Sequence, residues 1–291
     1  MDSQPLPILE QHQAHPRSFR SHRYVYPVLS RRSKGISVGI NLNPDKICNF
    51  DCIYCQVDRR EDSDLRFVAT DQLKEELETT LDWIASGRLF EDEAFASVPE
   101  PLRRLNDIAF SGDGEPTTFR NIDEIVSTVA GIKRRRGLDE VRMVLITNAS
   151  MFHRPVVARA IEVLMEHRGE IWAKLDAGTA DYFRLVDRTP IPFEQILNNI
   201  RLVARQHPLV IQSLFVRVDG VGPSEEEIAS YVERLSGLLR RGGKLKLIQV
   251  YTVARRPAED YVTSLPCDEV DAIAEQVRDR IPTPVEVYYG S

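Results

Sequence analysis

The stretch GISVGINLNPDKICNFDCIYCQ, residues 35–56, places an apolar run directly before a loop that carries Cys48, Cys52 and Cys55. Three of the four cysteines of the chain therefore lie close together. Thiolates at this spacing can converge on one soft metal centre, and cysteine thiolates are the usual ligands of iron–sulfur clusters. With three thiolates in the loop, one iron of a four-iron cluster would have no protein ligand. An iron with an open position can bind a substrate, whereas a fully ligated cluster only passes electrons.

A structural zinc site is the alternative interpretation of this loop. Such a site needs four ligands, so it would have to recruit Cys267 or a histidine from far along the chain. Cys267 itself stands in a Pro-Cys-Asp sequence at the start of an expected helix, where a thiol can be reactive. A buried cysteine, or one that neighbours a helix cap, is the simpler interpretation, and the role of Cys267 stays open.

Length and composition indicate one soluble globular domain. The chain has 291 residues, and α/β barrels often reach about 250 residues as a single unit. We therefore expect a barrel-like domain over residues 35–291, preceded by a basic and aromatic N-terminal extension over residues 1–34. Hydrophobic residues at 42% and charged residues at 28% are ordinary for a protein with a sizeable core.

Charge and cysteine usage bear on partners and location. The net charge of −6 argues against a protein that coats nucleic acid without specificity, although it allows a local basic patch. Clustered thiols, rather than an even and well-spread cysteine framework, indicate a reducing compartment. The N-terminus has no cationic start followed by an apolar stretch, and no run of about 18 apolar residues occurs. We expect a cytoplasmic protein without membrane contact.

The extension offers one such basic patch. Basic residues alternate there with aromatic residues, an arrangement that can clamp phosphates and stack bases. The residues are Arg17, Arg20, Arg23, Arg31, Arg32 and Lys34, with Phe19, Tyr24 and Tyr26 among them. The alternative is an edge hairpin with one solvated face.

From residue 35 onward, apolar runs alternate with amphipathic segments, which predicts a parallel sheet covered by helices. We expect strands over residues 36–42, 107–112, 142–149, 171–178, 209–220, 244–253 and 284–290. We expect helices over residues 70–86, 121–137, 154–169, 192–207, 224–243 and 267–281. Capping boxes are expected from Asn121 to Glu124 and from Ser224 to Glu227. The pattern alone allows an open doubly wound sheet or a full or partial barrel.

The order Cys48, Cys52, Tyr54, Cys55 resembles the Cys-x3-Cys-x-aromatic-Cys motif of the radical S-adenosylmethionine (SAM) superfamily. The resemblance implies a partial (β/α)6 barrel, which six strands before the last one would fit. It also implies a [4Fe-4S] cluster held by the three cysteines, with SAM bound at the open iron. Tyr54, the aromatic residue of the motif, is then a candidate for contact with SAM.

In parallel α/β folds, the loops that follow the strands build the site. One such loop is SGDGEPT, residues 111–117, in which glycines let the backbone approach a ligand closely. It resembles the Gly-Gly-Glu motif with which superfamily members hold the amino group of SAM, so Gly112, Asp113, Gly114 and Glu115 are candidates for SAM binding. Asp113 stands where the first glycine of that motif is usual. Taken alone, a Gly-Asp-Gly sequence would simply be a turn.

Later strand ends supply four more candidates by the same resemblance, namely Asn148, Asp176, Arg217 and Tyr251. Thr147-Asn148 resembles a Thr-Asn-Gly motif in which Ala149 replaces glycine. Asp176 can reach the ribose hydroxyls or the carboxylate of SAM, Arg217 resembles a position that meets that carboxylate, and Tyr251 lies where superfamily members hold adenine. Lys174 alternates with Asp176, and the two would form either a structural salt bridge or a substrate clamp.

The chemistry that the resemblance implies is reductive cleavage of SAM. An external one-electron donor of the flavodoxin or ferredoxin type supplies the electron, and a 5′-deoxyadenosyl radical abstracts hydrogen from the substrate. The cofactors carry this chemistry, and the protein orients the reactants and excludes water.

For the substrate, the strings NPDKICNFDCIYCQVDR, KLDAGTADYFRLVDRT and YTVARRPAED resemble the group related to wyosine tRNA synthases. Those synthases carry a second cluster on N-terminal cysteines, whereas this chain has no cysteine before Cys48. A tRNA or nucleotide substrate is favoured by the basic extension and by KRRR at 133–136. A peptide or small metabolite is favoured by the net acidity. A non-enzymatic electron carrier is the third hypothesis, disfavoured because three cysteines cluster rather than four.

Overall fold

The computed structural model describes residues 19–57, 59 and 68–290, and the chain forms two compact units that interleave along the sequence. The first unit consists of residues 1–47, 63–145 and 160–169, and the second of residues 48–62, 146–159 and 170–291. Arg17 and the N-terminal arm lie outside the described residues. The expected boundary between an extension over residues 1–34 and a domain over residues 35–291 is not tested by these two units. It stays a prediction.

The first unit contains strands in the order β1-β2-β3-β4. Their bounds are β1 Val25–Ser30, β2 Gly35–Ile40, β3 Leu105–Phe110 and β4 Arg142–Thr147, the last two residues of which belong to the second unit. β2, β3 and β4 run parallel, and every residue of β2 is buried. A strand that is buried on both faces has a nearly continuous apolar sequence. This pattern is why the sequence predicted β2.

The extension contributes β1 to a hairpin at the edge of the sheet, as the alternative interpretation expected, and the residues of β1 and β2 are buried or half-buried. β1 pairs antiparallel with β2, with Val25 opposite Ile40 and Ser30 opposite Gly35. Tyr26 is 1% exposed, and its ring lies where a side chain on Gly39 would have to be. Phe19 and Tyr24 are also buried, so these aromatic rings belong to the core and are not available to stack on bases.

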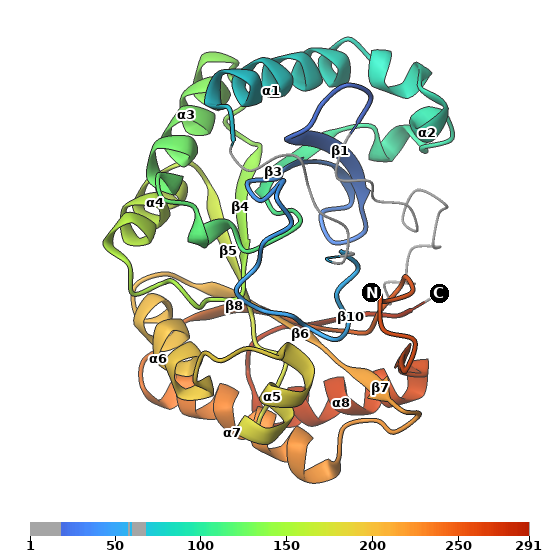
Figure 1. The fold of residues 1–291 in the computed structure, drawn as a ribbon, viewed down its shortest axis with the longest axis vertical. Helices are drawn as coiled ribbons and strands as arrows, with labels where there is room; N and C mark the ends of the chain where they lie inside the picture. Colours follow the sequence, from blue (N-terminus) through green and yellow to red (C-terminus); the bar gives the residue numbers. More distant parts are fainter. Residues whose placement is uncertain (1–18, 58, 60–67, 291) are drawn as a thin grey trace. The chain divides into compact units, whose positions relative to one another are not determined.

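Helices α1 Thr70–Ala85 and α3 Ile122–Arg135 lie beside one another outside the strands of the first unit (Figure 1). Leu73, Leu77 and Leu81 of α1 are buried, as their helical spacing predicts. The chain leaves α1 through Gly87, whose φ of 81° is favourable for glycine. The short helix α2 Glu93–Ala96 follows, and α4 Pro155–Glu166 is divided between the two units.

The second unit contains parallel strands in the order β5-β6-β8-β10. Their bounds are β5 Gly169–Lys174, the first residue of which belongs to the first unit, β6 Leu209–Leu214, β8 Leu245–Tyr251 and β10 Val285–Tyr288. The helices of this unit lie along one side of these strands (Figure 1). They are α5 Ala180–Asp187, α6 Phe193–Ala204, α7 Glu225–Arg240 and α8 Cys267–Arg280.

Some local expectations were wrong. The single strand expected over 209–220 is two strands, because the chain leaves the sheet after Leu214 and β7 Val216–Val218 pairs instead with β9 Val262–Ser264. Helix α5 was not expected.

Asn121 precedes α3 without a side-chain cap, since its amide contacts the Glu124 carboxylate, whereas Ser224 does accept from the Glu227 amide. None of the helices in the described ranges has the length and hydropathy needed to cross a membrane.

Candidate active site

The cysteine loop, residues 48–57, belongs to the second unit. All four cysteines of the chain are thiols rather than disulfides, and those at positions 48, 52 and 55 are half-buried. The Cys55 amide donates to the Cys52 carbonyl at 2.9 Å, which closes a tight turn around Tyr54. Cys267 is exposed at the first residue of α8.

The first anchor of this loop is the segment that follows β4. Asn49 donates from its side-chain amide to Ser150 Oγ at 2.7 Å, and Asn148 donates to Asn49 Oδ1 at 2.9 Å. Ala149, which stands where the resembled motif has glycine, has a φ of 61°. The predicted residue Asn148 therefore contacts the cysteine loop itself, and its role toward SAM stays a prediction.

The second anchor is the C-terminal end of α5. The amides of Asp51 and Ile53 donate to the carbonyls of Asp187 and Val186, at 3.2 and 2.9 Å. The last carbonyls of a helix lack partners within it, and here the cysteine loop supplies them.

Tyr54 lies at the centre of a buried polar group. Its phenol donates to Asp176 and contacts Asp187 Oδ1 at 3.2 Å, while Lys174 Nζ donates to the same phenol at 3.1 Å. Asp176 also accepts from the Leu214 amide at 2.8 Å and lies 3.8 Å from Lys174 Nζ. Lys174 and Asp176 therefore lie on the same side of the chain, as their alternation predicted, and the Tyr54 phenol contacts both.

Burial sets the electrostatics of this group. Desolvation, followed by the neighbouring charge of Asp176, raises the pKa of Asp187 to about 8. Desolvation and the nearby Asp187 also raise the pKa of Cys52, whose thiol lies 3.4 Å from Asp187 Oδ1. Burial alone would lower the pKa of Lys174, but Tyr251 and the carboxylates around it raise the pKa above its usual value. The acidic groups around the lysine therefore favour its charged form.

Two predicted residues at later strand ends have different surroundings. Tyr251, at the end of β8, is buried in one apolar cluster with Ile53 and Tyr54. Arg217, on β7, is paired with Glu269 of α8 and is not part of the polar group around Tyr54. The structure thus brings Tyr54, Asp176 and Tyr251 together and leaves Arg217 apart from them.

The Gly112–Glu115 segment belongs to the first unit and follows β3. Asp113 accepts from the Asn41 amide at 2.6 Å, and the Asp113 amide donates back to Asn41 Oδ1 at 3.1 Å. A Cβ atom on Gly112 would meet Asn41 at 2.2 Å, and one on Gly114 would meet the Ile47 carbonyl at 2.3 Å. Both glycines are therefore required for the close packing of this turn against residues 41–47.

Glu115, the acid of this segment, is 3% exposed. Its carboxylate accepts from the Thr117 amide at 3.0 Å and from the Thr117 hydroxyl, which caps a short 3₁₀ helix over residues 116–118. In this structure its carboxylate is thus engaged locally.

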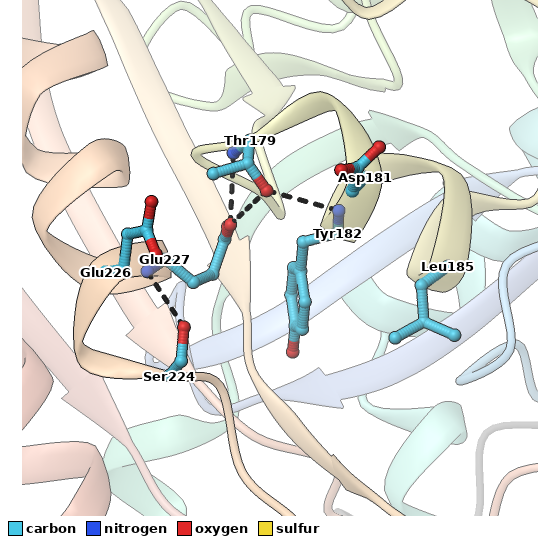
Figure 2. A pocket seen from close by; sticks show the side chains of 7 residues that line it. All are labelled: Thr179, Asp181, Tyr182, Leu185, Ser224, Glu226 and Glu227. Carbon is cyan, nitrogen blue, oxygen red and sulfur yellow. Dashed lines mark hydrogen bonds between the residues drawn. The ribbon is translucent and has the colours of Figure 1, made fainter.

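A cavity of about 380 Å³ lies between the first turns of α5 and α7 (Figure 2). Its lining consists of Thr179, Asp181, Tyr182, Leu185, Ser224, Glu226 and Glu227. Glu227 accepts from the Thr179 amide at 3.1 Å and from its hydroxyl at 2.6 Å, so this carboxylate joins the two helices. None of the residues that the sequence predicted for the site lines this cavity.

Sequence reasoning missed Asn49, Asp187 and Arg188, which anchor the cysteine loop in the second unit, and Asn41, which contacts Asp113 in the first unit. Asp187 and Arg188 were part of a quoted string, but a charged pair at the end of a helix reads as solvated surface. Their importance depends on contacts with residues more than 100 positions away. No local signal in the sequence could have identified them.

The cysteine loop supplies three thiols that could ligate an iron–sulfur cluster. No group of three or more His, Cys, Asp or Glu side chains in the described part of the chain is gathered at metal-binding spacing. The donor set fits a cluster by its chemistry, since three thiols project from a single anchored loop and thiolates are the ligands that such clusters use. Cys48, Cys52 and Cys55 would hold the cluster.

Comparison with known proteins gives curated relatives of unequal coverage. A protein of Brachyspira hyodysenteriae named GTPase Obg is 23% identical over 261 residues, which cover 87% of this chain and 33% of that one. A UPF0026 protein of Helicobacter pylori is 27% identical over 177 residues, which cover 60% of this chain and 48% of that one. A UPF0026 protein of Methanocaldococcus jannaschii is 31% identical over 142 residues, which cover 46% of this chain and 36% of that one. The chain thus matches between a third and a half of the length of these relatives.

Among solved structures, the chain is similar to TYW1 with a lysine-pyruvate adduct bound, with a TM-score of 0.51 and 17% identity over 85% of this chain and 74% of that one. This likeness concerns the fold. The model of the radical SAM superfamily matches residues 42–235. The predicted fold class, a partial barrel of radical SAM type, is thereby confirmed, as are the [4Fe-4S] cluster and SAM, the cofactors of that superfamily. The chain belongs to the radical SAM superfamily.

Proposed function

We propose that this protein is an enzyme that reductively cleaves SAM and abstracts a hydrogen atom from its substrate. The observation that supports the proposal is the cysteine loop itself, with three thiols anchored beside Asn148 and α5 in a chain of this superfamily. When bound, the cluster and SAM supply electron transfer and the 5′-deoxyadenosyl radical. A flavodoxin- or ferredoxin-type donor is the partner that we propose for reduction.

The residues of the chain would bind and orient these groups. Cys48, Cys52 and Cys55 would hold the cluster, and Tyr54 and Asp176, which are joined by a buried hydrogen bond, would bind SAM. We propose that Asn148 and Tyr251 also contact SAM. Gly112 to Glu115 are proposed to bind the amino group of SAM. Arg217 would have to leave Glu269 before it could bind a carboxylate.

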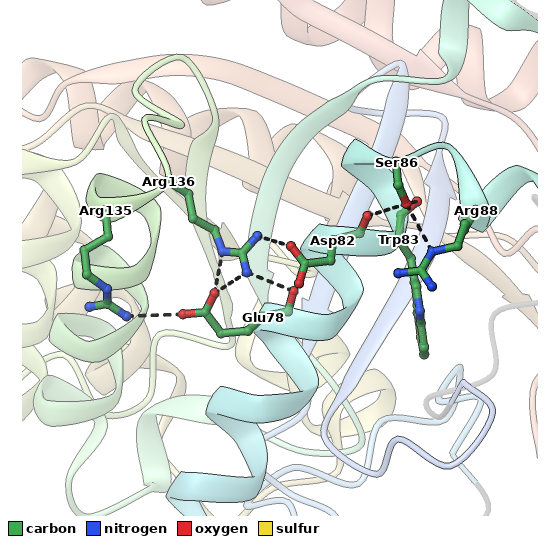
Figure 3. Close-up of polar contacts among 7 residues, drawn as sticks. All are labelled: Glu78, Asp82, Trp83, Ser86, Arg88, Arg135 and Arg136. Atoms are coloured by element: carbon green, nitrogen blue, oxygen red, sulfur yellow. Dashed lines mark hydrogen bonds and ion pairs between the residues drawn. The ribbon is translucent and has the colours of Figure 1, made fainter.

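For the substrate, we propose tRNA or another nucleotide first, supported by the resemblance of residues 43–59, 174–189 and 251–260 to the group related to wyosine tRNA synthases. A peptide or small metabolite is the second candidate, and a specific observation favours it. In the basic run at 133–136, Lys133 is buried and donates to the Asp139 carbonyl, while Arg135 and Arg136 pair with Glu78 (Figure 3). Arg20 of the extension pairs with Asp92 and lies over Trp83. These cations are engaged within the protein.

The proposal is tested by incubating anaerobically reconstituted and reduced protein with SAM and measuring 5′-deoxyadenosine. Cys52→Ala should lose both the cluster iron and the product, while Cys267→Ala, the matched cysteine outside the loop, should keep both. Iron without product in the wild-type protein would support the electron carrier instead, and bound zinc in place of iron would overturn the proposal.

The two substrate classes are separated by tRNA binding over a series of salt concentrations. A nucleic-acid enzyme should show an affinity that falls steeply with salt, because binding releases counterions from the phosphates. Absence of measurable binding at low salt would favour the peptide or small metabolite.

A further inference from the structure

Arg188 immediately follows α5 and contacts the cysteine loop through its side chain. Its Nε donates to the Asp51 carbonyl at 2.7 Å, and its Nη2 pairs with the Asp51 carboxylate at 3.1 Å. Arginine is suited to this task because its planar group presents several donors in a fixed fork. One side chain thus holds both the main chain and the side chain of a residue adjacent to Cys52.

The other edge of the same guanidinium reaches a second loop, residues 254–261. Nη1 pairs with Glu259 at 2.7 Å and lies 3.4 Å from the hydroxyl of Tyr261. This second loop also contacts the cysteine loop directly, because the Ala258 amide donates to the Cys55 carbonyl at 3.1 Å. Arg188 therefore links Asp51, the neighbour of the candidate ligand Cys52, to the loop that contacts the candidate ligand Cys55.

The backbone of Arg188 indicates that the side chain is what matters at this position. Its φ and ψ are 40° and 55°, the left-handed conformation that commonly ends a helix and that favours glycine. A side chain other than glycine is strained in this region. Glycine would relieve the backbone strain at this position. The four contacts of the guanidinium explain why arginine is present instead.

We propose that Arg188 is a positioning residue for the cluster, which fastens the cysteine loop and the 254–261 loop onto the end of α5 so that the loop is shaped before a cluster binds. This inference rests on the proposed function, since it assigns the loop to a cluster. Arg188 acts through Asp51 and Glu259 rather than as a ligand of the cluster.

The test uses Arg188→Gly, which removes the side chain and relieves the backbone strain together. In the cluster-free full chain, the Asp51 and Ile53 amides should exchange hydrogen about tenfold faster than in wild type, the factor that corresponds to losing one charge-assisted hydrogen bond. In the reconstituted protein, loss of cluster absorbance to a chelator should accelerate by a similar factor. The thermal midpoint should stay equal or rise, which a merely structural role would not allow.

Arg184→Ala is the matched control, because Arg184 lies on the same helix in an exposed pair with Asp181 and should change none of these rates. Glu259→Gln leaves the backbone at residue 188 untouched and should accelerate exchange of the Ala258 amide. Unchanged amide exchange in both Arg188→Gly and Glu259→Gln overturns the inference. Because exchange is measured without a cluster, this result is distinguishable from a failure of the proposed function, in which the wild-type protein would not assemble the cluster.

Discussion

The phenol of Tyr54 donates a hydrogen bond to the carboxylate of Asp176, and both side chains are buried although 122 residues separate them in the sequence. The same oxygen accepts from Lys174. Tyr54 is therefore the residue through which the cysteine loop joins the end of β5.

Tyr54→Phe should lower the free energy of unfolding by about 1–3 kcal/mol, because it leaves buried charged groups without their shared partner. Denaturant unfolding of the cluster-free protein measures this change. Tyr182→Phe is the matched control, since the Tyr182 hydroxyl is buried without a hydrogen-bond partner among the described residues and its loss should be neutral or stabilising. Equal effects of the two substitutions would contradict the assigned role of Tyr54.

The stability of the cluster-free protein should fall as pH rises from about 4 to about 8 through the contribution of Asp187. Its pKa is raised from 3.8 to about 8, so the folded state keeps a proton that the unfolded state has released. The folded state binds more protons in this window, which makes the slope negative and at most about 1.4 kcal/mol per pH unit. Asp187→Asn should flatten the curve in urea titrations over this range.

The exposed Asp181 on the same helix supplies the control, and Asp181→Asn should leave the slope of wild type unchanged. Parallel curves for wild type and Asp187→Asn would show that Asp187 does not hold the proton.

Gly114→Ala should destabilise the protein by about 1–3 kcal/mol, because the added Cβ would meet the Ile47 carbonyl at 2.3 Å and backbone would have to move. Gly131→Ala is the opposite case, since its Cβ would meet nothing closer than 3.5 Å and alanine favours the helix by about 0.5–1 kcal/mol. Thermal unfolding of both variants gives the comparison. A stable Gly114→Ala protein would show that residues 41–47 do not pack closely on this turn.

Arg136→Ala should cost about 1 kcal/mol, the upper range for a surface pair, because its guanidinium contacts both Glu78 and Asp82 of α1 (Figure 3). Arg134→Ala, at an exposed neighbouring position, should stay within about 0.5 kcal/mol of wild type. A double-mutant cycle of Arg136 with Glu78 isolates the pairwise energy. A coupling energy of zero would contradict the pairing of Arg136 with Glu78. Arg136 would then count among the cations that could bind a nucleic acid.

The sequence alone determined the features that are local along the chain. The cysteine motif, the alternation of buried strands with amphipathic helices, and the termination of α1 at Gly87 all depend on residues within a few positions of each other. Side-chain character and backbone preference act at that range, and these expectations were confirmed by the structure and by the superfamily match.

Only the tertiary structure decided which residues face each other across long separations. The contacts of Asn49 with Ser150, Asp51 with Arg188 and Tyr54 with Asp176 span 101 to 137 residues. It also decided that Phe19 and Tyr26 are core residues and that the KRRR run is largely engaged within the protein. The physical reason is that composition gives a side chain its charge or apolar area, whereas the packing of distant segments determines whether a neighbouring group or solvent meets it.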